Sequence, residues 1–140
     1  MGGCGRIFCA METSEKPMMR RELLALHRAL VESERREYER SRGRMTDRAF
    51  LEALIGAPEL AWLNPLTSLI VRLEEAVEEN AAETARGAAV ADCVAEIRKL
   101  LRPNAGGYGF QRKYAEAMQR SPEVVVAHGR AVTAVGREES

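Results

Sequence analysis

Two histidines, a tyrosine and a cysteine carry the chemistry in this 140-residue chain that could bind a ligand. The ordinary pKa of a histidine lies close to neutrality, so His27 and His128 could act as acid–base groups or as metal ligands. Cys93 adds a thiol and Tyr114 a phenol. Together these four residues form one candidate set, which implies a small-ligand or metal-binding helical bundle.

The neighbours of the two histidines favour a structural role instead. A di-iron bundle uses a Glu-x-x-His pattern, which places a carboxylate and an imidazole on one helix face. Glu22 and Glu123 each precede a histidine by five residues and so lie off that face. We therefore expect hydrogen-bonded structural histidines, with no metal and no cofactor. Whether His27 and His128 share a pocket stays open at this point.

Other reactive patterns lack the context that their chemistry needs. Residues 106–109 (GGYG) follow an expected helix and lack Gly-Lys-Ser/Thr, so they do not form a phosphate-binding loop. Thr67 and Ser68 stand outside a Gly-x-Ser-x-Gly nucleophile elbow. Cys4 and Cys9 have no second pair to complete a zinc site. We assign no catalytic residue, and the chain leans towards a non-enzymatic function.

The charges are balanced overall but unevenly distributed. The chain has 21 basic and 21 acidic residues, with basic residues concentrated in 16–48 and glutamates in 49–85. These two regions attract each other, within the fold or across a salt-sensitive dimer, or else the basic region binds an anionic partner. A net charge of zero argues against nucleic acid as that partner. The candidate interaction surface consists of Arg35, Arg36, Arg40, Arg42, Arg44, Glu74, Glu75, Glu78 and Glu79.

A protein-interaction module that forms a homodimer is the function that these charges favour. The alternatives are the ligand-binding bundle described above and nucleic-acid binding through the arginines of residues 35–44.

Cysteine use and hydropathy predict the compartment. Three cysteines make an odd count without a disulfide framework, which fits a reducing cytoplasm. No apolar run reaches the roughly 18 residues that indicate a transmembrane helix. Residues 1–11 are too short and glycine-rich for a signal peptide. We expect a cytoplasmic protein without a membrane partner, and leave open whether Met1 or Met11 is the true start.

Composition predicts an all-α fold. Hydrophobic residues make up 46% and charged residues 30% of the chain. Ala, Leu, Glu and Arg dominate, and these residues lose little side-chain freedom in a helix. We expect an up-and-down bundle of about four main helices with short helices attached. Residues 1–15 are expected to form a disordered tail, 16–135 a single domain and 136–140 a frayed end.

Capping residues and apolar spacing set the expected helices. Met19, Leu23, Leu26 and Leu30 repeat at a 4-3-4 spacing and mark one buried stripe. Thr46 is an expected N-cap for a short helix whose inward face carries apolar side chains. That face consists of Phe50, Leu51, Leu54 and Ile55. The expected helices cover residues 17–41, 47–55, 65–80, 83–101, 110–119 and 122–135.

Residues 50–70 are the densest apolar segment and hold the single tryptophan. Asn64 and Pro65 give a helix start signal, with Asn64 as the cap and Pro65 in the first turn. Trp62 is expected to lock the 47–55 helix against the bundle. The predicted core consists of Trp62, Leu66, Leu69, Ile70 and Leu73.

Residues 61–70 (AWLNPLTSLI) and 121–128 (SPEVVVAH) resemble segments of small, uncharacterised bacterial all-α proteins, a family of unknown function. The resemblance spans about residues 20–128 and rests on an apolar-Trp-Leu-x-Pro-Leu core after a long charged helix. It implies a soluble helical bundle. That family carries no assigned activity, so the resemblance transfers no catalytic residue.

Overall fold

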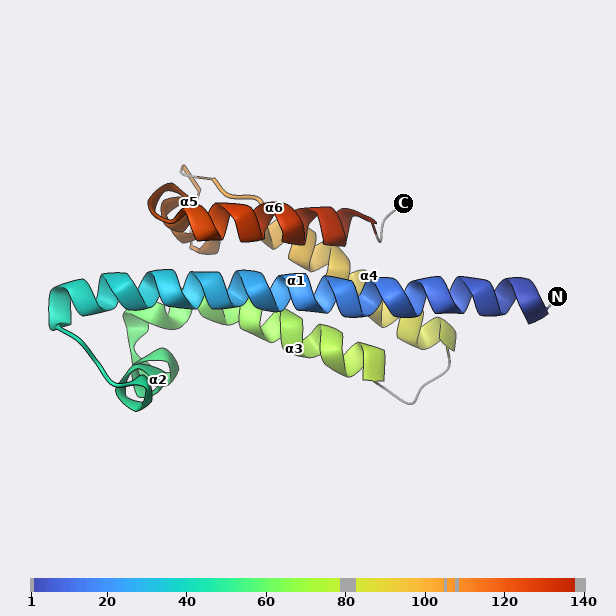
Figure 1. Cartoon of the computed structure of the whole chain (residues 1–140), viewed down its shortest axis with the longest axis horizontal. Helices are drawn as coiled ribbons and strands as arrows, with labels where there is room; N and C mark the ends of the chain where they lie inside the picture. Colours follow the sequence, from blue (N-terminus) through green and yellow to red (C-terminus); the bar gives the residue numbers. More distant parts are fainter. Residues whose placement is uncertain (1, 79–82, 105, 108, 138–140) are drawn as a thin grey trace.

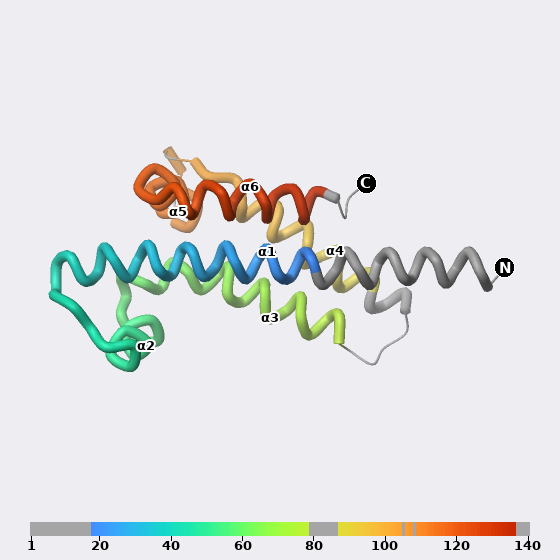
Figure 2. Tube along the Cα trace, viewed as in Figure 1, coloured from blue at the N-terminus to red at the C-terminus, as the bar shows by residue number. Residues whose placement is uncertain are grey.

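The computed structural model describes the backbone of residues 2–78, 83–104, 106–107 and 109–137, with side chains for 18–78, 87–104, 106–107 and 109–136 (Figure 2). This part of the chain consists of helices without a strand, which confirms the all-α prediction. The elements are α1 (Gly2–Arg42), α2 (Asp47–Gly56), the 3-10 helix η1 (Pro58–Leu63), α3 (Asn64–Glu78), α4 (Glu83–Leu100), α5 (Phe110–Arg120) and α6 (Pro122–Arg137).

The long helix α1 runs the length of the molecule and the other helices pack along it (Figure 1). Helices α3 and α6 run opposite to α1, whereas α4 runs in the same direction (Figure 1). Helix α1 packs mainly against α6 and α3, and α3 packs against α4. The short helix α5 leads into α6, and α2 projects from the end of the molecule where α1 stops (Figure 1).

The apolar stripe of α1 packs into the centre of this arrangement. Met19, Leu23, Leu26 and Leu30 are all completely buried. The helix begins at Gly2, well before the expected start at residue 17, so Pro17 lies inside it and removes one backbone hydrogen bond. The side chains of residues 1–17 lie outside the described part. The expected disorder of residues 1–15 and the expected fraying of residues 136–140 stay predictions, although α6 reaches Arg137.

The α1–α2 corner follows the expected turn chemistry. Gly43 adopts a φ of 90°, which only glycine takes readily, and ends α1. The Thr46 hydroxyl accepts a 3.1 Å hydrogen bond from the first turn of α2. The predicted inward face of α2 is right for Phe50, which is buried, and for Leu54, which is half-buried and packs against the core, but wrong for Leu51 and Ile55, which are 56% and 80% exposed. The cause is that α2 packs chiefly on η1, which covers only one side of it.

Trp62 has a different role from the predicted one. Its Nε1 donates a 2.8 Å hydrogen bond to Glu34 on α1, and its ring lies 5.3 Å from the Phe110 ring on α5. The half-buried Trp62 thus joins η1 to α1 and α5 rather than fixing α2. Asn64 has helical backbone angles, so α3 continues directly from η1 without the predicted side-chain cap.

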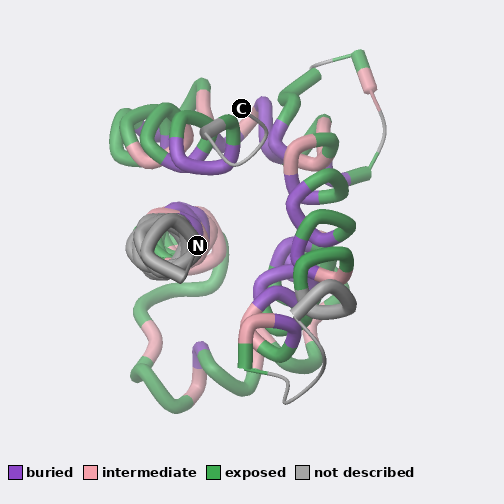
Figure 3. Tube along the Cα trace, turned by 90° about the vertical axis from the view of Figure 1, so that its right-hand side faces the viewer, coloured by how far each residue is buried: buried purple, intermediate pink, exposed green. Residues whose placement is uncertain are grey.

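The buried residues lie where the helices face one another (Figure 3). On α3, the predicted core residues Leu66, Leu69, Ile70 and Leu73 are all buried. Helix α4 contributes Val90, Cys93, Val94 and Ile97, α5 contributes Phe110, Tyr114 and Ala117, and α6 contributes Val124, Ala131, Ala134 and Val135.

Candidate functional site

His27 is held by α3. Its Nε2 lies 2.8 Å from the Thr67 hydroxyl oxygen, and that hydroxyl donates to the carbonyl oxygen of Leu63. The Thr67 oxygen therefore accepts the proton of His27 Nε2. Partial burial lowers the pKa of His27 and so favours the neutral form of the ring.

His128 is held by α5. The Tyr114 hydroxyl lies 2.5 Å from His128 Nδ1, and the two rings meet edge to face with centroids 5.4 Å apart. Burial raises the pKa of Tyr114 and lowers the pKa of His128, so the phenol keeps its proton and the ring stays neutral. In the tautomer that carries the His128 proton on Nε2, the Tyr114 hydroxyl donates to Nδ1.

The four predicted ligand residues do not form one set. His27 bonds to α3, His128 bonds to Tyr114 on α5, and Cys93 is buried in α4 with a pKa raised by that burial. No three His, Cys, Asp or Glu side chains gather into a metal site within the described residues. Both histidines have the hydrogen-bonded partners expected of structural residues.

The two histidines should make folding sensitive to mild acid. The unfolded rings bind protons near the ordinary pKa of 6.5, and the folded rings bind them only at lower pH. The free energy of unfolding should thus be level above about pH 7 and fall as the pH drops through 6.5. Denaturant unfolding across this range, compared with a His27→Gln/His128→Gln variant, measures the effect. A slope that the variant leaves unchanged contradicts this assignment.

The predicted basic surface at the end of α1 is largely occupied by contacts within the chain. Arg35 binds Glu39 at 3.0 Å and Asp47 at 2.8 Å, and its guanidinium lies over the Phe50 ring. The hydrogen bond from Arg35, followed by one from the Met45 backbone N–H, lowers the pKa of Glu39. The other ion pairs of this region are Arg36–Glu123, Arg40–Glu37 and Arg42–Glu59.

The acidic half of the predicted interaction surface takes no part in those pairs. Glu74, Glu75 and Glu78 make no ion pair with another described residue, and Glu79 lies outside the described residues. Arg44 is exposed at the α1–α2 corner, likewise without an ion pair in the described part. One ion pair, Arg42–Glu59, therefore joins the basic region 16–48 to the acidic region 49–85, whereas the described glutamates at the end of α3 pair with no basic residue of the described chain.

A polar cluster around Arg120 was not predicted from the sequence. Arg120 at the end of α5 binds Ser33 at 3.1 Å and Glu34 at 2.5 Å, and its Nε lies 3.7 Å from Glu37. Glu34 also accepts the hydrogen bond from Trp62. This cluster ties α1, η1 and α5 together, and its members lie too far apart in the sequence for local spacing to indicate it.

The outer face of α6 is apolar and uncovered. Val125, Gly129, Val132 and Gly136 follow one another at a 4-3-4 spacing on the side away from the core, and the two valines are 44% and 41% exposed. A Cβ added at either glycine meets no atom within 4 Å. Val126, 55% exposed, extends the same face. We call these five residues the α6 stripe.

A shallow groove runs along the α6 stripe, and three of the stripe residues, Val125, Val126 and Gly129, line it. It has a volume of about 400 Å³ and lies between α1 and α6. Its lining includes Met18 and Glu22 on α1 and Arg130 and Thr133 on α6. The Thr133 hydroxyl donates to the Gly129 carbonyl oxygen at 2.9 Å, so it leaves no unpaired hydroxyl on this face.

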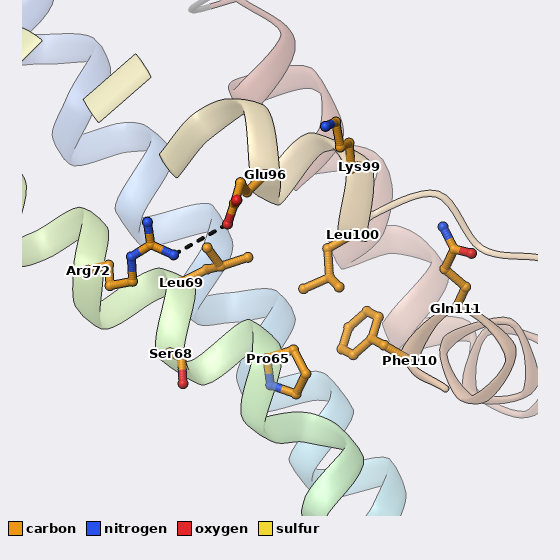
Figure 4. Close-up of a pocket in the computed structure, with 9 residues that line it drawn as sticks. All are labelled: Pro65, Ser68, Leu69, Arg72, Glu96, Lys99, Leu100, Phe110 and Gln111. Atoms are coloured by element: carbon orange, nitrogen blue, oxygen red, sulfur yellow. Dashed lines mark hydrogen bonds and ion pairs between the residues drawn. The ribbon is translucent and has the colours of Figure 1, made fainter. Parts of the chain in front are cut away.

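A larger groove opens between α3, α4 and the start of α5. Figure 4 shows Leu69, Leu100 and Phe110 converging from these three helices, with Pro65 below them. The groove has a volume of about 530 Å³. Arg72 and Glu96, paired at 3.3 Å, close one end, and the remaining lining residues are Ser68, Lys99 and Gln111.

Comparison of the chain with protein-family models, with curated proteins and with solved structures found no match. The resemblance to bacterial helical proteins accordingly stays a prediction. Among the described helices, none is both long and apolar enough to cross a membrane by itself. Helix α2 taken together with residues 58–78 passes that test of length and composition, with a bend of 76° between the two parts.

Proposed function

We propose that this chain is a non-enzymatic interaction module that acts as a homodimer, with the outer face of α6 as the interface. The observation that carries the proposal is the α6 stripe. A helix on the surface of a bundle normally has one apolar face and one polar face. Helix α6 has apolar residues on two faces, because Val124, Ala131 and Val135 are buried on a different face from the stripe.

The stripe is complementary to a second copy of itself. In an antiparallel α6 pair that places Val125 opposite the second copy's Gly136, Val132 falls opposite the second copy's Gly129. Both relations define the same two-fold axis, between residues 130 and 131. Each valine then meets a glycine, which lets the helices approach closely and fills the space above both glycines. Such self-complementarity is what a two-fold symmetric interface requires.

The charges beside the stripe fit the same pairing. Glu22 and Arg130 line the groove between α1 and α6, and neither makes an ion pair with another described residue. Arg130 lies next to the proposed axis, and Glu22 lies on α1 in the same groove. Because the contact is mainly apolar, the dimer should weaken less with salt than one formed by the charged end of α1.

Nucleic-acid binding through that end has less support, because Arg35, Arg36, Arg40 and Arg42 already have partners within the chain. The cytoplasmic location stays a prediction from the sequence.

Gly129→Leu tests the interface without disturbing the single chain. A Cβ at this position meets no atom within 4 Å in the monomer, and replacing a helix glycine should stabilise the monomer by up to about 1 kcal/mol. In the dimer the leucine side chain would collide with Val132 of the second copy. We therefore expect the dissociation constant of the dimer to rise at least about tenfold. Light scattering coupled to size exclusion, over a dilution series, measures this change.

Gly87→Leu is the matched control. Gly87 also lies in a helix, on α4, with open space above it and far in sequence from the stripe. It should leave the dimer intact. If both variants weaken association equally, or if neither does, the α6 stripe is not the interface.

A further inference from the structure

The groove in Figure 4 has the size and lining of a small-molecule site. Ligand sites usually occupy about 300–1,000 Å³ and combine apolar walls with a few polar groups. The floor here is apolar, since Leu69 and Phe110 are 7% and 8% exposed. This groove lies on the α3–α4 side of the bundle, so it is distinct from the α6 stripe.

The aromatic wall of the groove is held firmly from behind. The Phe110 ring lies 5.3 Å from the Trp62 ring and 5.3 Å from the Tyr114 ring. Trp62 is fixed by Glu34, and Tyr114 is fixed by His128. A ligand that packs on Phe110 would therefore meet a preformed surface, which reduces the ordering cost of binding.

The polar rim favours an anion. Arg72 and Glu96 neutralise each other at one end of the groove. Lys99 on the α4 side is exposed and makes no ion pair with another described residue. The lining therefore holds two cations and one anion, a net charge of +1. The long, flexible stem of a lysine lets its ammonium follow a charged group at the mouth of a groove.

We propose that this groove binds a small amphiphile with an apolar chain and a single carboxylate group. The chain packs on Leu69, Leu100 and Phe110, and the carboxylate binds the Lys99 ammonium. Ser68 and Gln111 supply neutral hydrogen-bonding groups on the same rim. The site uses none of the four residues that the sequence marks as ligand-binding candidates.

Trp62 provides a direct reporter for this site, because it is the single tryptophan and its ring contacts the wall residue Phe110. We expect decanoate, added to the full chain below its micelle concentration, to change the Trp62 fluorescence in a saturable way. Decylammonium, with a chain of the same length and the opposite charge, should bind at least about tenfold more weakly. Calorimetric titration gives the affinities independently of the fluorescence.

Two variants locate the binding. Ser68→Phe fills the groove and should abolish the decanoate signal, and its helical circular dichroism confirms that the chain still folds. Lys99→Gln removes the cation and should weaken binding at least about tenfold, because a charge-assisted hydrogen bond is lost. Lys113→Gln, an exposed position on α5 outside the groove, is the control and should change nothing.

The proposal is overturned if decanoate fails to bind, if decylammonium binds as well as decanoate, or if Lys99→Gln and Lys113→Gln behave alike. None of these outcomes affects the dimer proposal, which is measured by mass.

Discussion

Replacing Trp62 with alanine should lower the free energy of unfolding by about 3 kcal/mol, the lower end of the range for truncating a large aromatic side chain. The lower end applies because Trp62 is half-buried rather than fully buried. The loss combines the ring contact with Phe110 and the hydrogen bond to Glu34. Equilibrium denaturant unfolding measures it, with Val71→Ala, an exposed position on α3, as the control.

A second variant separates the two contributions of Trp62. Trp62→Phe keeps an aromatic ring beside Phe110 and removes the Nε1 donor. It should lower the free energy of unfolding by about 1–2 kcal/mol, and the smaller part of this loss should come from reduced packing. Glu34 would keep its bond to Arg120. A near-neutral Trp62→Ala would show that this ring is not part of the core and would remove the role assigned to it.

Disrupting the Arg120 cluster should cause the second large loss in the free energy of unfolding. Arg120→Met keeps an unbranched apolar stem and removes the cation that binds Glu34, Glu37 and Ser33. Breaking a buried ion pair costs about 3–5 kcal/mol. The Arg120 and Glu34 side chains are 29% and 13% exposed, so solvent screens part of this, and we expect about 2–3 kcal/mol.

A double-mutant cycle isolates the pair from the rest of the cluster. Arg120→Met, Glu34→Gln and the combined variant should reveal a coupling energy of about 1–2 kcal/mol. Arg112→Met is the matched control, because its pair with Glu116 is 3.5 Å long with side chains 64% and 45% exposed. Arg112→Met should lower the free energy of unfolding by about 0.5 kcal/mol or less. Equal losses for Arg120 and Arg112 would contradict the cluster's role.

Local sequence patterns predicted the helices well, because apolar spacing and capping contacts join residues that are close in the sequence. The spacing of Met19, Leu23, Leu26 and Leu30 predicts a buried stripe, and the structure buries all four. Thr46 caps α2 through its own hydroxyl, a contact that spans three residues. Composition alone predicted the all-α fold, because strong helix formers dominate the chain.

The errors arise where tertiary packing decides the outcome. Helix α2 has a regular apolar face, yet Leu51 and Ile55 are exposed because the rest of the chain covers only its other side. The sequence predicts that Trp62 packs against α2, whereas its actual partners lie on α1 and α5. Such long-range partners leave no trace in the spacing of neighbouring residues.

Most of the candidate sites could not be predicted from the sequence, because they also depend on contacts between distant parts of the chain. The charges of residues 35–44 suggested a free basic surface, but Arg35, Arg36, Arg40 and Arg42 bind acidic residues of α1, α2, η1 and α6. The α6 stripe does have a sequence signal, the 4-3-4 spacing of Val125, Gly129, Val132 and Gly136. This spacing indicates an exposed apolar surface only when the structure shows that another face of α6 fills the core. The groove of Figure 4 needs three helices in place and has no local signal.

Sedimentation equilibrium of the unaltered chain, from nanomolar to high-micromolar concentration, tests the proposed homodimer most directly. We predict that the measured mass rises from that of one chain to that of two, and that Gly129→Leu shifts this rise to higher concentration while Gly87→Leu leaves it in place. A mass equal to one chain at every concentration would contradict the proposed function.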